Sequence, residues 1–438
     1  MAQILPMHSL ELEPQRRRAR VLLPAALLAA GAVLAAEQLG LAFQAPPSAK
    51  LQLRGQQRVL GQQQLQASTF AGLDARALSA PAARGTVEGS SYEASLPLVL
   101  AATALAAAAT SEAAVEKESS LFDKIKLPIF VGCWYFFNVQ YNIQNKMLMN
   151  AFSATWAISF IQLASGIPIA MLMWASGLLQ VPSVTRADII KLTPVGAAFA
   201  AGQVATVASL GAVAVSFTHV VKALEPAINA VASGLILGQV FHPMVYASLL
   251  PVFAGVALAS SSELSFTPFG FATAMASNFC FVTRNVLATK FGSTGDMGED
   301  KVTRKTNQLS VLTIVATAVL FPLALLLPGG LMSVPAAWSA SIAKGVPASK
   351  LVTMLATSGF YFFMYQLSSF WVLSCVPPIT HSVLNTLKRV VIIVVSIVVF
   401  RTPVTKMGLI GTLTAIGGVL LYTLTKAHYS KKEKEQSK

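Results

Sequence analysis

Residues 377–401 read PPITHSVLNTLKRVVIIVVSIVVFR, an apolar stretch long enough to cross a bilayer, with Lys388 and Arg389 side by side near its middle. A charge at the centre of a spanning helix costs roughly 2.5–3.5 kcal/mol on insertion scales. Apolar residues flank the pair on both sides, so neither charge has a short route to water. The stretch therefore predicts an internal anion site. The alternative is that the pair snorkels to an interface or pairs with an acid.

Composition places the whole chain in a membrane. Of its 438 residues, 54% are hydrophobic and 11% are charged, which is too apolar for a soluble domain of this size. Apolar windows of about 20 residues recur, each long enough to span the hydrocarbon core. The formal net charge of +14 is spread over a basic N-terminus, a few intramembrane cations and a basic tail, so we expect no nucleic-acid partner.

The three cysteines, Cys133, Cys280 and Cys375, stand alone in separate apolar segments. The sequence has no CxxC motif and no cluster of cysteine and histidine, so it predicts no disulfide, no metal site and no cofactor. It also lacks the HExxH, GxSxG and Walker motifs, so we do not expect an enzyme.

The first 120 residues predict targeting rather than a folded domain. Residues 1–42 are typical of a signal peptide, with arginines before a short apolar run. Residues 43–120 are typical of a transit peptide and linker, rich in Gln, Ala and Arg near their start. The apolar run 96–110 is either a stop-transfer anchor or a cleavable linker. The two leaders in series, the second opening at Phe43, resemble the bipartite leaders of secondary plastids, which extra membranes surround.

Residues 121–426 predict an all-α polytopic domain, and residues 427–438 a polar basic tail. Short polar segments or Pro and Gly separate most of the apolar stretches. We expect ten transmembrane helices, over roughly 127–148, 152–179, 191–212, 215–237, 241–260, 266–290, 308–332, 351–374, 378–400 and 406–425.

An internal repeat runs through this domain. At an offset of 162 residues, Thr218-His219 corresponds to Thr380-His381, Gln203 to Tyr365 and Gly255 to Gly417. The third to fifth helices and the eighth to tenth therefore read as copies, which predicts a five-plus-five inverted repeat with a substrate site between the halves. The alternative is chance similarity between two apolar hairpins.

Two further cations fall inside apolar segments. Lys222 lies about a turn inside the fourth predicted helix, and Arg284 lies inside the sixth. With Lys388 and Arg389 they oppose one plausible acid, Glu225, so we expect a net positive cavity that selects anions. Arginine suits phosphate because its paired donors match the phosphate oxygens. The alternative is that Lys222 pairs with Glu225, three residues away.

Neutral polar residues adjoin these cations on neighbouring helices, and we expect them to supply hydrogen bonds to a substrate: Thr206, Gln203 and Tyr365. Tyr365 has the alternative of core packing. Pro226, in the fourth predicted helix, is expected to kink it.

Four segments carry a family resemblance: WYFFNVQYNIQNK, VSFTHVVKALEP, SNFCFVTRNVLATK and THSVLNTLKRVVIIVVSIVVFRTPV. Together they resemble the plastid phosphate translocators of the drug/metabolite transporter superfamily, over about residues 121–426. The resemblance implies a ten-helix antiporter that exchanges inorganic phosphate for triose phosphate, 3-phosphoglycerate, phosphoenolpyruvate or sugar phosphates across a plastid membrane.

The resemblance also implies roles for single residues. It assigns the phosphate to Lys222, Lys388, Arg389 and Thr206, and the rest of the substrate to Arg284 and Tyr365. Gln203 departs from the family pattern, because it falls where triose-phosphate members carry His and phosphoenolpyruvate members carry Asn. That amide favours phosphoenolpyruvate or a broad three-carbon range. A nucleotide-sugar or hexose-phosphate transporter of the same superfamily, or a multipass protein without transport, remains the alternative.

Overall fold

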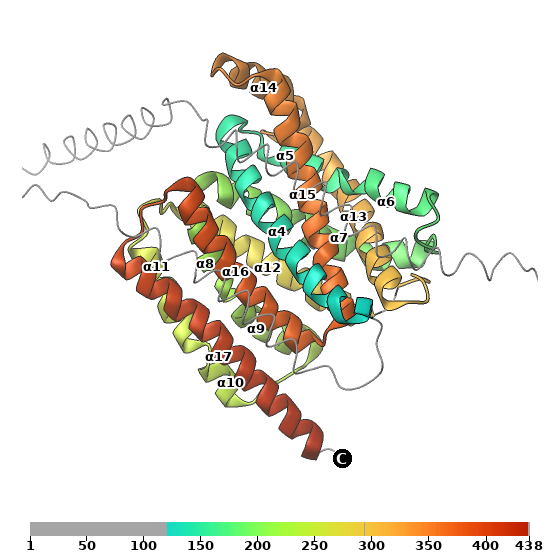
Figure 1. Ribbon diagram of the computed structural model, residues 1–438, viewed down its shortest axis with the longest axis vertical. Helices are drawn as coiled ribbons and strands as arrows, with labels where there is room; N and C mark the ends of the chain where they lie inside the picture. The colour runs from blue at the N-terminus through green and yellow to red at the C-terminus, as the bar shows by residue number, and fades with distance from the viewer. Residues whose placement is uncertain (1–120, 293, 437–438) are drawn as a thin grey trace, which may run out of the picture. The chain divides into compact units, whose positions relative to one another are not determined.

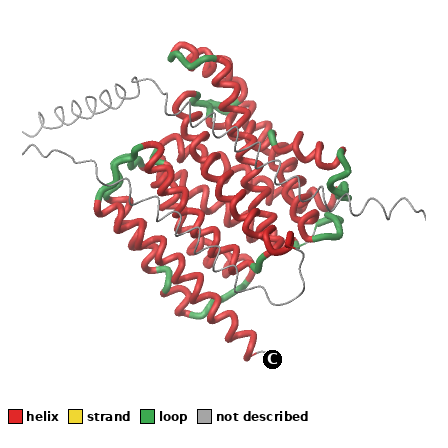
Figure 2. The backbone as a smooth tube through the Cα atoms, in the orientation of Figure 1, coloured by secondary structure: helices red, strands yellow, loops and turns green. Residues whose placement is uncertain are grey.

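The computed structural model describes residues 121–292 and 294–436, and the predicted leaders lie outside these residues. The described chain is helical, with two short 3-10 turns (Figures 1 and 2). Its elements in order are α4 (Leu121–Ala151), α5 (Thr155–Ala164), α6 (Gly166–Ala175), α7 (Arg186–Ala212), α8 (Val215–Val221), η2 (Lys222–Leu224), α9 (Glu225–Leu237), α10 (Pro243–Ala247), α11 (Leu250–Ser261), α12 (Pro268–Phe291), α13 (Lys301–Leu326), η3 (Leu331–Ser333), α14 (Val334–Ala343), α15 (Ala348–Cys375), α16 (Pro378–Phe400) and α17 (Lys406–Gln436).

Seven helical segments of the described chain are long and apolar enough to cross a membrane. They are Thr155–Ala175, Arg186–Ala212, Val215–Leu237, Pro243–Ser261, Lys301–Leu326, Thr380–Phe400 and Lys406–Lys432. The chain is therefore an all-helical, multi-span membrane protein. Helices α4, α12 and α15 are also long enough to span a bilayer, at 31, 24 and 28 residues, but they are more polar.

The polarity of α4 faces inward. The side chains of Asn138, Gln140, Asn142, Gln144 and Asn145 are all buried. A buried amide must find hydrogen-bond partners inside the bundle, so α4 links its neighbours by polar contacts as well as by apolar packing.

Three of the expected helices are divided. The range 152–179 forms α5 and α6, 215–237 forms α8, η2 and α9, and 241–260 forms α10 and α11. Each division begins at or next to the residue whose carbonyl would accept from a proline four positions later. The three prolines are Pro168, Pro226 and Pro251. A proline has no N–H to donate to that carbonyl, which removes one hydrogen bond of the ladder. Pro194 and Pro322 nevertheless lie inside unbroken helices, so proline alone does not force a break.

Helix α16 keeps the bounds that the sequence predicts. Pro378 occupies the first helical position, where the missing N–H costs nothing. At the other end Arg401 has φ 49°, in the left-handed region, and the Thr402 N–H donates to the Ile397 carbonyl at 3.1 Å. Helix α17 instead continues to Gln436, beyond the predicted end at residue 425.

The helices that carry the cations pack around α7 and α4. Helix α7 lies against α12 and α13, and α4 lies against α15 and α16. Figure 1 shows α17 running alongside α10 and α11, and α11 and α17 are in extensive contact.

Two glycines allow α11 and α17 to approach closely. A Cβ on Gly255 would lie 2.3 Å from the Ala415 nitrogen, and one on Gly411 would lie 2.5 Å from the Ala259 nitrogen. Neither position has room for a side chain. Gly417, the repeat counterpart of Gly255, has no atom within 4 Å of such a Cβ, so the two glycines do not share a packing role.

Gly255→Ala is therefore expected to force α11 and α17 apart. Overpacking of this kind costs about 1–3 kcal/mol, and we expect a lower melting temperature of the purified protein in detergent. Gly417→Ala is the matched control on the same helix pair and should leave the melting temperature unchanged or slightly raised. Equal melting temperatures for both variants would show that the helices do not depend on this contact.

Candidate functional site

The backbone around Lys222 is shaped by Pro226. Because that proline has no N–H, the Lys222 carbonyl cannot receive the usual hydrogen bond from four residues on. The Glu225 N–H donates to the Lys222 carbonyl instead. This shift makes the 3-10 turn η2, and the Asn278 Nδ2 of α12 donates to the Val221 carbonyl, next to the turn, at 3.0 Å. Helix α12 is thereby fixed to the irregular turn that carries Lys222.

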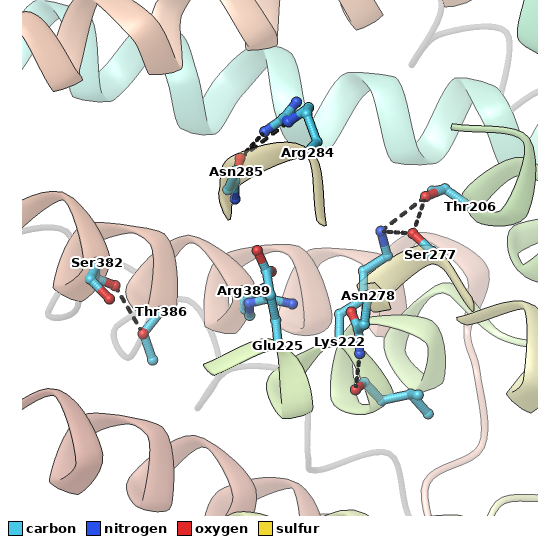
Figure 3. A network of polar contacts seen from close by, with 11 residues as sticks. Thr206, Lys222, Glu225, Ser277, Asn278, Arg284, Asn285, Ser382, Thr386 and Arg389 are labelled. Carbon is cyan, nitrogen blue, oxygen red and sulfur yellow. Dashed lines mark hydrogen bonds and ion pairs between the residues drawn. The ribbon is translucent and has the colours of Figure 1, made fainter. Parts of the chain in front are cut away.

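The Lys222 ammonium is held by two hydroxyl groups (Figure 3). Its Nζ donates to the Thr206 Oγ1 of α7 and to the Ser277 Oγ of α12, both at 3.0 Å. The two hydroxyls are themselves 2.7 Å apart. The structure thus brings Lys222 and Thr206 together as predicted, and it adds Ser277, which the sequence analysis did not single out.

Arg389 of α16 forms an ion pair with Glu225 of α9. The alternative in which Lys222 pairs with Glu225 is therefore wrong, and an acid does meet one of the two adjacent cations of α16. The physical reason is that a buried guanidinium needs an anion, whereas two hydroxyl oxygens already accept from Lys222. The Arg389 side chain is 9% exposed and that of Glu225 is 26% exposed.

Lys388 lies over an aromatic ring. Its Nζ is 4.7 Å from the ring centroid of Trp134 on α4, a cation–π contact. The Trp134 ring also stacks on His381, two turns before Lys388 on α16, at 4.7 Å and 16°. Next to Trp134, the Tyr135 hydroxyl donates to the Leu384 carbonyl at 2.6 Å. Lys388 is thus positioned by α4 rather than by an acid of its own.

The charges of this group act on one another. Glu225 interacts electrostatically with Arg389, Lys222 and Lys388, and Arg284 interacts with Glu225. One acid against four cations leaves the group strongly positive. Such a group can bind an anion, and the mixture of guanidinium, ammonium and hydroxyl donors suits phosphate oxygens.

Arg284 lies over two aromatic rings. Its Cζ lies 5.0 Å from the Phe199 ring centroid and 5.2 Å from that of Phe281. Its Nε and Nη2 donate to the Asn285 Oδ1 at 3.1 and 2.9 Å, as Figure 3 shows. Its Nη1 is buried and has no hydrogen-bond partner in the part of the chain that is described. One edge of the guanidinium is therefore anchored and the other is unpaired.

Gln203 and Tyr365 both contact Tyr141. The Gln203 Nε2 donates to the Tyr141 hydroxyl at 2.8 Å and to the Gln162 Oε1 at 2.6 Å. The Tyr365 and Tyr141 ring centroids are 5.1 Å apart. The seven predicted residues thus fall into two neighbouring groups, one around Lys222 and the ion pair and one around Gln203 and Arg284.

Sequence reasoning missed five residues of these groups: Trp134, Tyr141, Gln162, Ser277 and Asn278. The available signal was a polar or amphipathic side chain inside an apolar stretch, such as Ser-Asn in FATAMASNFCFV. That signal is weak, because the same residue types also serve as packing residues that bond to their own helix.

The fold and this site define a multi-span helical membrane protein with buried cations that can bind an anion. Residues 125–423 match the sequence model of the Triose-phosphate Transporter family. The match covers more than half of the chain, and the chain belongs to that family. It is a transporter.

Curated relatives with different substrates in their names are similarly close. The phosphoenolpyruvate/phosphate translocator 1, chloroplastic, of Oryza sativa subsp. japonica is 38% identical over 315 residues, covering 72% of this chain and 75% of the relative. The triose phosphate/phosphate translocator, chloroplastic, of Solanum tuberosum is 38% identical over 309 residues, with 70% and 72% covered. The glucose-6-phosphate/phosphate translocator 1, chloroplastic, of Arabidopsis thaliana is 37% identical over 315 residues, with 72% and 79% covered.

Glu225→Ala is expected to destabilise the protein, because it leaves the Arg389 guanidinium without its anion. Leaving one partner of this part-buried pair without its hydrogen bond costs about 1–3 kcal/mol, and thermal unfolding in detergent would measure the loss. Glu299→Ala, at an exposed position, is the control and should have little effect. The double variant Glu225→Ala/Arg389→Ala should recover part of the loss. A Glu225→Ala protein as stable as wild type would mean that the ion pair contributes nothing to folding.

Proposed function

We propose that the protein is an antiporter that exchanges inorganic phosphate for a phosphorylated three-carbon metabolite across a plastid membrane. The observation that carries the proposal is that, among the described residues, the three cations Lys222, Lys388 and Arg389 interact with a single acid, Glu225. The relatives' names, which pair phosphate with an organic phosphate, support the same reading.

In this proposal the two groups of residues divide the substrate between them. Lys222, Lys388, Arg389 and Thr206 bind the phosphate that every substrate shares, by charge and by hydroxyl donors. Arg284, Tyr365 and Gln203 contact the remainder. A bound phosphate competes with Glu225 for Arg389 and draws Lys388 away from the Trp134 ring, so both cations exchange a weaker partner for a dianion.

We also propose that the domain consists of ten transmembrane helices in a five-plus-five inverted repeat. The packed helix pairs support it. When each helix is replaced by the one five positions away in the expected order of ten, one packed pair becomes another packed pair. The pair α4–α15 becomes α12–α7, α4–α16 becomes α12–α9, and α13–α7 becomes α5–α15. The substrate would then lie between the halves near the bilayer midplane.

The cations also give a reason for obligatory exchange. When the empty carrier closes, Lys222, Lys388 and Arg389 are brought into a dry site, where mutual repulsion and desolvation are both costly. A bound dianionic phosphate neutralises them and lets the two halves rock past each other. The empty carrier therefore changes sides slowly, and each substrate that enters is matched by one that leaves.

The site of action that we propose is the envelope of a secondary plastid. The two predicted leaders, residues 1–42 and 43–120, support import through extra membranes. The names of the relatives describe chloroplast proteins.

Exchange by the purified protein in liposomes is the direct test of this function. Uptake of labelled phosphate should be fast with phosphate, triose phosphate, 3-phosphoglycerate or phosphoenolpyruvate inside, and close to background with empty liposomes. Glucose 6-phosphate inside the liposomes tests the hexose-phosphate alternative, and this compound is named in a 37% identical relative. A nucleotide sugar inside tests the nucleotide-sugar alternative. If folded protein gave no uptake with any phosphate compound inside, the proposal would be wrong.

Lys388→Gln is expected to uncouple exchange. Removing one cation lowers the cost of closing the empty site, so phosphate efflux into substrate-free buffer should rise relative to exchange. Exchange itself should fall because the phosphate loses a charged partner. Lys344→Gln, which removes an exposed charge between α14 and α15, should change neither rate. Fast efflux by the wild-type protein without a counter-substrate would exclude this mechanism.

A further inference from the structure

A chain of buried amides runs from α4 through α5 to α7. It consists of Asn145, Gln162 and Gln203, and it ends on the hydroxyl of Tyr141. These four side chains are at most 2% exposed. Turning any one of these amides alone would place two donors or two acceptors against each other, so their orientations are set together along the chain. The Asn145 Nδ2, at the other end, is also buried without a hydrogen-bond partner among the described residues.

The chain has a direction. The Gln162 Nε2 donates to the Asn145 Oδ1 at 3.0 Å and to the Ser358 Oγ at 2.6 Å. The Gln162 Oε1 is thereby turned to α7, where it accepts from the Gln203 Nε2 at 2.6 Å. Both N–H groups of Gln203 are used, by Gln162 and by Tyr141.

The other end of the Gln203 amide is unpaired. Its Oε1 is buried and accepts no hydrogen bond from any described residue. A carbonyl oxygen can only accept, so this atom calls for a hydrogen-bond donor on a ligand. Phosphate and carboxylate oxygens of an ionised substrate cannot donate, but an alcohol hydroxyl can.

The position of Gln203 along α7 shows which part of a ligand would meet it. Phe199, Gln203 and Thr206 are spaced by four and three residues and so share one face of the helix. Thr206 holds Lys222 at 3.0 Å, and the Phe199 ring lies 5.0 Å from the Arg284 guanidinium. The unpaired acceptor of Gln203 thus lies between the phosphate-binding cations and Arg284.

Arg284 supplies the complementary group at the far end. Its Nη1 is a buried donor without a partner among the described residues, and an arginine edge of this kind suits a carboxylate. In order along α7, the site offers charge for a phosphate, an acceptor for a hydroxyl and a donor for a carboxylate. This order matches a phosphorylated three-carbon hydroxy acid such as 3-phosphoglycerate.

We propose that Gln162 is a positioning residue that turns Gln203 into a hydrogen-bond acceptor, and that the site therefore prefers a phosphorylated hydroxy acid to phosphoenolpyruvate, which has no hydroxyl. This inference rests on the phosphate-exchange function proposed above. It differs from the expectation that the amide at position 203 favours phosphoenolpyruvate or a broad three-carbon range, and the experiment below decides between the two.

Counter-exchange in liposomes tests it with a matched pair of substrates. 3-Phosphoglycerate and 3-phosphooxypropionate have the same charges and differ only in the hydroxyl. Each rate is divided by the phosphate–phosphate exchange rate of the same protein. The wild type should have a KM for 3-phosphoglycerate about tenfold below that for the deoxy analogue, because one buried hydrogen bond distinguishes them. Phosphoenolpyruvate should resemble the analogue.

Variants of Gln162 separate positioning from mere packing. Gln162→Leu should reduce the tenfold KM ratio to about one, since nothing then fixes the Gln203 amide. Gln162→Glu should keep the ratio, because a glutamic acid buried at this position stays protonated: one oxygen donates to the Asn145 Oδ1 in place of the Nε2, and the other still accepts from the Gln203 Nε2. Ser358→Ala removes one acceptor of Gln162 and should reduce the ratio partway, which gives a milder variant if Gln162→Leu does not fold. Gln366→Leu, at another buried glutamine on α15, is the control and should leave the ratio at its wild-type value.

The outcomes distinguish the two proposals. Phosphate–phosphate exchange together with a wild-type ratio near one would overturn this inference and leave the antiporter standing. So would a preference for phosphoenolpyruvate, or an unchanged ratio in Gln162→Leu. The absence of phosphate–phosphate exchange by folded protein would overturn the antiporter, and this inference with it.

Discussion

The desolvation of positive charge inside a helical bundle is the constraint on which this structure depends. An unpaired cation at the centre of a membrane is costly, and the protein reduces that cost in three different ways. Arg389 has a carboxylate, Lys222 has two hydroxyls, and Lys388 and Arg284 lie over aromatic rings. Hydroxyl groups and aromatic rings neutralise no charge. A cation–π contact contributes about 0.5–2 kcal/mol, so these cations still gain from an anion.

The backbone meets this constraint through its prolines. The 3-10 turn before Pro226 places Lys222 and Glu225 at the junction of α8 and α9, where they reach different partners. Asn278 of α12 donates to the Val221 carbonyl next to this turn. That hydrogen bond joins the segment that carries Lys222 to the helix that carries Arg284.

Much of this could be predicted from the sequence, because insertion into a bilayer leaves strong local signals. The range 378–400 coincides with α16, since prolines and a left-handed residue mark its ends. The cations were found because charge in an apolar stretch is conspicuous. The partner of Glu225 was not predicted, because Arg389 lies 164 residues away and the spacing along one helix favours the nearer Lys222. The amide chain was missed for the same reason, since Gln162 contacts residues on three other helices.

Overall similarity cannot decide which metabolite such a protein carries. Relatives named for phosphoenolpyruvate, triose phosphate and glucose 6-phosphate are 38%, 38% and 37% identical to this chain, so overall identity does not separate the three substrates. Charge is a poor candidate, because every one of these compounds carries a phosphate and needs the same cations. A neutral amide is a better one, since reversing its direction exchanges a donor for an acceptor without altering charge or volume. In this chain that direction depends on Gln162, which touches Gln203 rather than the predicted phosphate site. In the proposed antiporter, selectivity can therefore change through a residue outside the cationic group, while the electrostatics proposed to couple the two directions of exchange stay as they are.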